Sequence, residues 1–285
     1  MSDMGVGVPD TTMWSPLRAA ADGRDLVLTV DFGGARPEAG FAELTPLLPD
    51  DRAVLVTRPP DRVVDDAADA ARQVDAWRDA VLASGARVCT VIGYCTGAAV
   101  AARLAQDLAA HGHPVGLVLV DPAVAGAGQL LAAHRDAVES LVAVLDRAPA
   151  DAEATDPTPG PAPDLVELAR GLAADYARTA GRVGRELDLD DELVADLVVR
   201  VRRYLSYLVV VALTAPPTPQ DGPPTLTVLS AAHPPDAFPA VGGRQVRFDV
   251  PRADLLADAG VGRLLAEFVA GRPVTPAPAP GTPRR

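Results

Sequence analysis

The chain has 285 residues, of which 48% are hydrophobic, and a chain of this size can bury the core of one α/β domain. Its formal net charge of −12 and its isoelectric point near 4.7 argue against a nucleic-acid-binding protein. Its first residues lack the basic and apolar regions of a secretory signal, and the apolar run from Tyr207 to Leu213 is too short to span a bilayer. We therefore expect a soluble, cytoplasmic protein with no membrane partner.

The first part of the chain contains two short apolar segments and one amphipathic segment. Residues 1–24 are expected to form an irregular lead-in, and Leu26 to Val30 is rich in the aliphatic residues of a buried strand. Ala53 to Thr57 has the same character. Residues 63–83 repeat apolar side chains at helical spacing, which predicts an amphipathic helix. These elements begin the segment 25–122, which we expect to be the first part of an α/β core.

A strand, a tight turn and a helix are expected between residues 86 and 110. Val88 to Ile92 is apolar and β-branched, which predicts a strand buried on both faces, and Ala98 to Ala110 is rich in the helix formers Ala and Leu. Between them, Gly93-Tyr94-Cys95-Thr96-Gly97 has the G-x-nucleophile-x-G pattern of a nucleophile elbow. Glycines are needed there because so tight a turn brings neighbouring backbone close. Cys95 would lie at the helix N-terminus, where free N–H groups and the helix dipole favour a thiolate.

The pentapeptide alone fits an ordinary Gly-bounded turn equally well, so its context decides the interpretation. After the helix, Val115 to Val120 is a second apolar run, and it ends at Asp121. Strand, turn, helix and strand form a βαβ unit, in which the carboxyl ends of the parallel strands meet at one edge of the sheet. Cys95 and Asp121 are therefore expected at the same edge, as a nucleophile and a carboxylate. The other cysteine, Cys89, is expected to be a small core residue.

The segment VIGYCTGAAVAARLAQDLAAHGHPVGLVLVDP resembles the core of the thioesterase domains that end nonribosomal peptide and polyketide assembly lines. The resemblance covers about residues 14–271 and is strongest at 87–122. It implies an α/β-hydrolase fold with a mostly parallel sheet, with Cys95 in place of the nucleophilic serine and Asp121 as the triad acid. It also implies an acyl or peptidyl carrier protein as partner, whose phosphopantetheine arm presents the substrate. Neither a metal nor a cofactor of the protein's own is expected.

Helical patterns dominate from Ala123 to Pro224, where no strand is expected. This segment, 123–224, resembles the helical lid that thioesterases insert at this place. Residues 225–271 resume the α/β-hydrolase core, and the Pro-rich tail 272–285 is expected to be disordered. Within these segments the predicted helices are 130–145, 164–180, 191–213 and 261–270, and the predicted strands are 225–229 and 245–250.

A Gly-rich loop follows the predicted strand that ends at Val30. In hydrolases of this fold, such a loop supplies one N–H group of the oxyanion hole, and the residue after the nucleophile supplies the other. Gly33 or Gly34, together with Thr96, would fill these positions. A plain Gly-Gly turn that leads into a helix accounts for the loop equally well.

The catalytic histidine of the thioesterases has no counterpart at its usual place. The family carries it after the last strand in a V-P-G-x-H setting, whereas Val250-Pro251-Arg252-Ala253-Asp254 stands here and Asp254 falls near the imidazole position. His233 follows the predicted strand 225–229, on the catalytic edge. It is either the general base, reaching Cys95 from an unusual position, or a non-catalytic loop residue. The other histidines are expected on the opposite edge or in the lid: His111, His113 and His134.

These features favour acyl transfer over hydrolysis. A serine needs a base to become nucleophilic, whereas a cysteine at a helix N-terminus ionises with less help. Thioester exchange onto Cys95 is close to isoenergetic, but release by water needs a base that the missing histidine would have supplied. We therefore expect an enzyme, a thioesterase-like acyltransferase of natural-product biosynthesis that forms an acyl-enzyme on Cys95. The alternatives are a hydrolytic editing thioesterase and a catalytically inactive hydrolase-fold protein that binds a carrier or a small molecule.

One predicted lid helix carries three arginines close together, Arg200, Arg202 and Arg203. Carrier proteins are generally acidic, so electrostatic attraction makes this helix face a candidate for carrier docking. A solvated helix face, with no partner, accounts for the same residues equally well.

Overall fold

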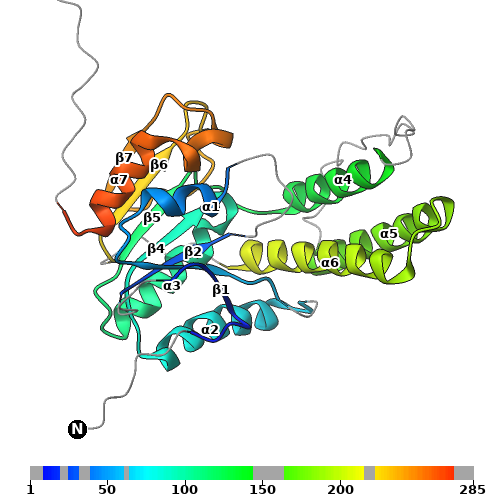
Figure 1. Ribbon diagram of the computed structural model, residues 1–285, viewed down its shortest axis with the longest axis horizontal. Coiled ribbons are helices and arrows are strands. Elements are labelled where there is room, and N and C mark those ends of the chain that lie inside the picture. The colour runs from blue at the N-terminus through cyan, green and yellow to red at the C-terminus, as the bar shows by residue number, and fades with distance from the viewer. Residues whose placement is uncertain are drawn as a thin grey trace, which may run out of the picture.

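A seven-stranded sheet runs through the centre of the molecule in the order β1-β3-β2-β4-β5-β6-β7 (Figure 1). The computed structural model describes residues 9–19, 25–31, 39–60, 64–143, 164–214 and 222–272. Neighbouring strands are parallel, except that the edge strand β1 pairs antiparallel with β3. The strands are β1 (Trp14–Arg18), β2 (Asp25–Val30), β3 (Ala53–Thr57), β4 (Arg87–Tyr94), β5 (Gly116–Val120), β6 (Thr225–Leu229) and β7 (Arg244–Arg247).

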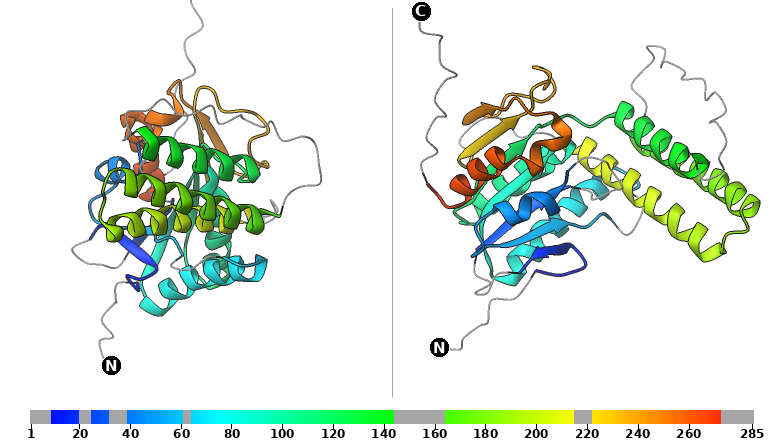
Figure 2. Two further views of the ribbon diagram at one scale, coloured as in Figure 1. Left: turned by 90° about the vertical axis from the view of Figure 1, so that its right-hand side faces the viewer. Right: turned by 45° about the horizontal axis from the view of Figure 1, so that its top comes forward.

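Helices cover both faces of the sheet, and each face has its own apolar core (Figures 1 and 2). Side chains alternate across a strand, so Leu117 and Leu119 of β5 join the first core while Val118 and Val120 join the second. Burial on both faces explains why the central strands have continuous apolar sequences. The first core includes residues of α2 (Ala67–Ser84), α3 (Ala98–Ala110) and α6 (Asp191–Leu213), and the second includes residues of α1 (Phe41–Leu44) and α7 (Ala259–Val269).

The helices α4 (Ala127–Ala143), α5 (Leu165–Glu186) and α6 lie between β5 and β6 in the chain and form a helical insertion. They project from one end of the sheet, as Figures 1 and 2 show. Leu141, Tyr176 and neighbouring side chains form a small apolar cluster of their own within the insertion. The C-terminal part of α6 returns to the main core, where the Tyr207 ring lies edge-on to that of Trp77 with 6.3 Å between centroids. The mostly parallel sheet with this insertion confirms the predicted fold class.

The N-terminal region differs from the sequence prediction. Trp14–Arg18 forms strand β1, whereas the sequence predicts an irregular lead-in there. An edge strand is paired on one side only, so it tolerates Pro16 and needs no alternating apolar pattern. Its anchor is Trp14, which is 1% exposed and donates its Nε1–H to the backbone carbonyl of Trp77 at 3.0 Å. The short helix α1 is also not predicted, because a single turn gives no periodic signal.

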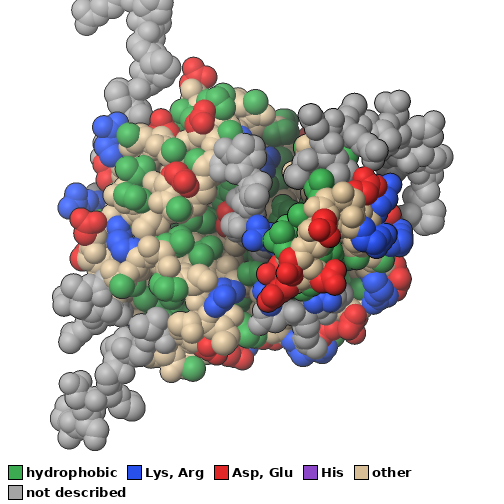
Figure 3. Space-filling view, turned by 45° about the vertical axis from the view of Figure 1, so that its right-hand side comes forward, with side chains coloured by type: hydrophobic (Ala, Val, Ile, Leu, Met, Phe, Trp, Pro, Cys, Tyr) green, Lys and Arg blue, Asp and Glu red, His purple; other side chains and the backbone are tan. Residues whose placement is uncertain are grey.

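Some predicted features lie outside the described residues. These are Gly33 and Gly34 of the proposed oxyanion hole and the tail after Arg272. Among the helices that the structure does describe, none combines the length and the apolar character needed to cross a membrane. The surface of the helical insertion carries acidic and basic side chains close together, as the space-filling view in Figure 3 shows.

Candidate active site

Cys95 occupies a strained turn between β4 and α3. It has a φ of 51°, in the left-handed region that residues other than glycine rarely adopt. The turn, η2 (Cys95–Gly97), is tightly enclosed: a Cβ on Gly93 would lie 2.9 Å from the Cα of Ala98, and one on Gly97 would lie 2.4 Å from the carbonyl oxygen of Val30. Both glycines are therefore required by close backbone approach. This is the geometry of a nucleophile elbow, in which the strained residue stands at the end of the strand.

Asp121 directly follows the neighbouring strand β5, and its carboxylate is buried. It is 3% exposed and also has a left-handed backbone, with a φ of 47°. Its Oδ1 accepts hydrogen bonds from the backbone N–H of Ser230 at 2.9 Å and from the Ser230 hydroxyl at 2.8 Å. A buried carboxylate requires such donors, because burial without partners would penalise its charge. Ser230 directly follows β6, so the two adjacent strand ends fix the orientation of Asp121.

His233 lies against Asp121, with its Nδ1 2.9 Å from Oδ1 of the carboxylate. Because an ionised carboxylate only accepts hydrogen bonds, Nδ1 carries the proton and the lone pair of a neutral ring is on Nε2. The loop that carries His233 is fixed by Arg247 of β7, whose Nη1 donates to the carbonyl of Ser230 at 2.8 Å. The imidazole is 7% exposed. The structure thus brings together two of the residues that the sequence singled out, at the carboxyl ends of β5 and β6.

Arg252 contacts both Cys95 and Asp121, and sequence reasoning missed it. Its Nη2 donates a hydrogen bond to Sγ of Cys95, and its Nε lies 3.6 Å from Oδ2 of Asp121. Asp254, which falls near the imidazole position of the family pattern, lies on the exposed side of η3 (Arg252–Ala257). The path of the loop, and not its alignment with a family pattern, decides which side chain turns inward. The only available signal was an arginine directly after Val250-Pro251.

The oxyanion-hole assignment rests on residues that the structure describes only in part. Thr96 is the residue after Cys95 in η2 and is half-buried, while Gly33 and Gly34 are not described. The carbonyl oxygen of Cys95 accepts two hydrogen bonds, one from the backbone N–H of Ala98 within the turn and one from the backbone N–H of Ala123 at 3.1 Å. The N–H groups at the start of α3 are the candidates for stabilising an oxyanion.

The other cysteine and histidines lie away from this edge of the sheet. Cys89 in β4 donates its thiol hydrogen to a backbone carbonyl of β2 at 3.2 Å, and burial raises the pKa of its thiol. His113 accepts a hydrogen bond from the backbone N–H of Val88 at 3.2 Å, at the opposite end of the strands, and burial lowers its pKa. His134 lies in the insertion, with its Nε2 3.1 Å from Oδ2 of Asp175.

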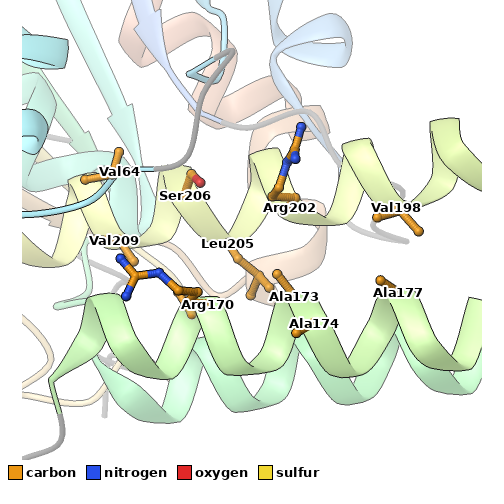
Figure 4. Close-up of a pocket in the computed structure, with 11 residues that line it drawn as sticks. Val64, Arg170, Ala173, Ala174, Ala177, Val198, Arg202, Leu205, Ser206 and Val209 are labelled. Atoms are coloured by element: carbon orange, nitrogen blue, oxygen red, sulfur yellow. The ribbon is translucent and has the colours of Figure 1, made fainter.

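A groove of about 250 Å³ lies between α5 and α6 of the helical insertion (Figure 4). Alanines line its α5 side, including Ala173 and Ala177, and Leu205 with valines lines its α6 side. Small side chains on α5 leave this space open where larger ones would fill it. Arg202 and Ser206 of α6 add polar groups to the lining. The groove is separate from the elbow, since none of the residues that line it belongs to the Cys95 turn.

No protein-family model and no curated protein matches the sequence, whereas solved structures share its fold. A structure of the Vlm2 thioesterase domain with genetically encoded 2,3-diaminopropionic acid, bound with a dodecadepsipeptide, is 18% identical over 93% of this chain and 100% of that domain, with a TM-score of 0.51. RedJ with a PEG molecule bound in its active site is 20% identical over 88% of this chain and 92% of its own, with a TM-score of 0.45. The NocB thioesterase domain, in covalent complex with a fluorophosphonate nocardicin G analogue, is 19% identical to this chain. The match covers 90% of this chain and 99% of that domain, with a TM-score of 0.43. The similarity to the Vlm2 thioesterase domain shows that this chain has the α/β-hydrolase fold predicted from its sequence.

Proposed function

We propose that this protein is a thioesterase-like acyltransferase of natural-product biosynthesis that forms an acyl-enzyme on Cys95. The observation that carries the proposal is the strained cysteine at the end of β4, beside the buried Asp121–His233 pair at the ends of the next two strands. A non-glycine residue in the left-handed region costs of order 1–3 kcal/mol and is maintained where function requires it. The shared fold with a thioesterase domain supports a thioester as the substrate class.

The first step is a thioester exchange. The Cys95 thiolate attacks the carbonyl carbon of the donor, the carbon–sulfur bond of the donor breaks, and the donor leaves as a thiolate that takes a proton from solvent. One thioester bond forms as another breaks, so the step is close to isoenergetic. The backbone N–H of Thr96 in η2, with one from Gly33 or Gly34, would stabilise the tetrahedral oxyanion.

In the second step, His233 is the general base. Asp121 holds the proton on Nδ1, so Nε2 can take the proton of an incoming amine or thiol as that group attacks the acyl carbonyl. The Cys95 thiolate is then released, and the acyl group has moved to the acceptor. Amines and thiols are better nucleophiles than water, which favours transfer.

The second candidate function is that of a hydrolytic editing thioesterase. The Asp121–His233 pair favours it, because an imidazole oriented by a carboxylate also activates water. The two functions differ only in the acceptor. Free acid as the main product in the presence of amine and thiol acceptors identifies the hydrolase, and acylated acceptor identifies the transferase.

The proposed donor is an acyl or peptidyl group on the phosphopantetheine arm of a carrier protein. The arm ends in a thiol, so it both presents a thioester and leaves as a thiolate after the exchange. An acidic carrier would be attracted by arginines on the helical insertion, which projects from one end of the sheet (Figure 2).

Intact-protein mass spectrometry tests the proposal and separates the two steps. Wild-type protein is mixed rapidly with an acyl thioester on a carrier, and the acyl-enzyme, free acid and acylated acceptor are followed in time. Cys95→Ala is expected to gain no acyl mass. His233→Ala is expected to load Cys95 within about threefold of the wild-type rate but to release the acyl group about 10²–10⁴-fold more slowly, as for a lost general base.

Cys89→Ala is the matched control for the first variant, and it should load like the wild type because Cys89 lies at the far end of β4 from the turn. An adduct that still forms on Cys95→Ala contradicts the assigned nucleophile. Release at the wild-type rate from His233→Ala contradicts the assigned base. Absence of any adduct on the wild type supports an inactive, carrier-binding protein instead.

A further inference from the structure

The guanidinium of Arg252 lies between the thiol of Cys95 and the carboxylate of Asp121. Nη2 donates a hydrogen bond to Sγ, and Nε lies 3.6 Å from Oδ2 of the carboxylate. The contacts use different nitrogen atoms, so one planar group reaches both partners at once. The other carboxylate oxygen, Oδ1, is engaged by Ser230 and His233. Arg252 and His233 therefore approach Asp121 at different oxygens and do not compete for it.

Tyr94 fixes the position of Arg252. Its hydroxyl donates a hydrogen bond to the backbone carbonyl of Arg252 at 3.2 Å, and the guanidinium carbon lies 5.9 Å from the centre of its ring. A cation over an aromatic ring at this distance is attracted to it. Tyr94 immediately precedes Cys95, so the residue that ends β4 positions both the thiol and its cationic neighbour. The Arg252 side chain is 41% exposed, so it forms the solvent side of a site whose Asp121 side chain is 3% exposed.

A guanidinium has hydrogen-bond donors and no acceptor, and it keeps its charge at all pH values at which the protein is folded. In the contact with Arg252, sulfur is therefore the acceptor, and the charged form of the thiol gains most from it. The guanidinium cannot take a proton from Cys95, which is the step that an imidazole performs for a serine. It can only stabilise a sulfur that has already lost its proton.

We propose that Arg252 is a catalytic residue that holds Cys95 as a thiolate, so that loading needs no general base. The inference rests on the proposed function of Cys95 as the acylated nucleophile. Arg252 then serves the first step and His233 the second. When the acyl group is attached, the sulfur loses its charge and Arg252 keeps its ion pair with Asp121. When the acyl group leaves, the thiolate regains its partner.

Other titratable groups also surround the elbow. Of these, the Asp121 carboxylate opposes ionisation of Cys95, and its charge is balanced by Arg252 and by the hydrogen bonds to its Oδ1. Removal of Arg252 would therefore act twice, since it takes away the cation at the sulfur and leaves the negative charge of Asp121 less compensated. Among the residues that the structure describes, the elements packed around the turn also carry Tyr94 of β4, Asp31 after β2, His233 after β6 and Tyr207 of α6.

The pH dependence of Cys95 alkylation tests the proposal without any acyl donor. Iodoacetamide rates are measured from about pH 5 to 9 in a Cys89→Ala background, which leaves one thiol. Arg252→Gln is expected to move the half-maximal rate upward by about one to two pH units. Near pH 6.5, alkylation of the Arg252→Gln variant should be about tenfold slower than with Arg252 in place, because a smaller fraction of the thiol is ionised. The fall is limited to this size because the thiolate of a more basic thiol is intrinsically more reactive. Arg252→Lys, which keeps a positive charge, should recover most of that rate.

A purely structural role for Arg252 predicts a different result. Loss of packing would change the alkylation rate of Cys95 by the same factor at all pH values and leave the midpoint of the pH profile in place. An unchanged midpoint in Arg252→Gln therefore overturns the proposal. A profile that shifts in His233→Ala but not in Arg252→Gln overturns it as well, because it assigns the thiolate partner to the imidazole. Thermal unfolding of each variant shows that the folded protein is being compared.

The alkylation assay tests the role of Arg252, and the loading assay tests the proposed function, so either proposal can be wrong while the other holds. If no thioester loads Cys95 but Arg252→Gln shifts the pH profile of alkylation, the proposed function is wrong, and the role of Arg252 in stabilising the Cys95 thiolate is supported. If wild type loads normally and Arg252→Gln alkylates like the wild type, the proposed function stands and the role of Arg252 is wrong.

Discussion

At the scale of single residues, Cys95 and Arg252 are chemically matched. A guanidinium beside a serine would be of little use, because the hydroxyl needs a base that removes its proton and Arg252 has no acceptor atom. A cysteine ionises near neutral pH, so a neighbouring positive charge is enough to activate it. The contact between Nη2 of Arg252 and Sγ of Cys95 would thus assist a cysteine nucleophile and not a serine. Loading of Cys95 is common to transfer and hydrolysis, whereas release of the acyl group by water needs a base, which Arg252 cannot supply.

Arg252→His tests whether a general base at position 252 would promote hydrolysis. An imidazole at this place would have an acceptor nitrogen near the acyl sulfur and could be oriented by Oδ2 of Asp121. We expect hydrolysis of the Cys95 acyl-enzyme to rise by about tenfold to 10²-fold relative to transfer, because a new general base can activate water. The measurement is the ratio of free acid to acylated acceptor after a single loading.

Asp254→His is the matched control, since it places an imidazole on the same short helix but on its exposed side. Its product ratio should equal that of the wild type. A rise in free acid in Asp254→His, with none in Arg252→His, would show that position 254 and not position 252 faces the thioester.

At the scale of secondary-structure elements, α6 connects the helical insertion to the elbow. Its C-terminal part is buried in the main core, and the hydroxyl of Tyr207 lies 3.3 Å from where a Cβ on Gly97 would be. Its middle part borders the groove between α5 and α6, where Arg202 contributes to the lining, and carries Arg200 on its exposed side. A partner bound to the middle of α6 would therefore contact the same helix that packs against the Cys95 turn.

Charge reversal tests whether this part of α6 attracts a carrier protein. In the double variant Arg200→Glu, Arg202→Glu, loading from a carrier-bound thioester should fall by about tenfold at low ionic strength, and the loss should shrink as salt is added. Loading from a small thioester without a carrier should stay within about twofold of the wild type, because the chemistry at Cys95 is untouched.

Arg263→Glu on α7 is the control for net charge, because Arg263 is exposed on a helix that covers the opposite face of the sheet. It should leave carrier-dependent loading unchanged. Equal losses in Arg263→Glu and in the α6 variant would mean that overall charge, and not a docking face, controls the rate.

At the scale of the whole molecule, stability is expected to be uneven. Both faces of the sheet are packed by large apolar cores, whereas the outer part of the insertion is held by a small separate cluster of four buried side chains: Leu141, Tyr176, Ala180 and Val183. Local opening costs less free energy where fewer apolar contacts are broken. The projecting α4 and the outer end of α5 should therefore open while the sheet stays folded.

Amide hydrogen exchange followed by mass spectrometry checks this expectation. Amides of α4 should exchange at least about tenfold faster than those of β4, β5 and α3 under conditions in which the sheet is native. Equal protection in α4 and β4 would mean that the insertion and the sheet unfold as one unit.

The local sequence determined most of the elements and the elbow. Helical periodicity places α3 and α6 at the predicted boundaries, and the apolar run of β6 does the same, because these signals come from residues adjacent in the chain. The glycines at 93 and 97 likewise follow from local geometry, since the turn leaves no room for a Cβ. Together with the strand–helix–strand order of a βαβ unit, these local features were enough to predict that Cys95 and Asp121 lie at the same edge of the sheet.

Only the tertiary structure decided what meets Cys95 at that edge. Arg252 is 157 positions away from it in the chain, and His233 is 112 positions from Asp121. Both come from loops after strands, where no periodic pattern determines which side chain turns inward, so Arg252 rather than Asp254 reaches the thiol. The edge strand β1 was missed for the same reason, because its pairing with β3 stabilises it and its own sequence does not. Contacts between distant segments depend on the path of the backbone, and that path is set by the packing of the whole fold.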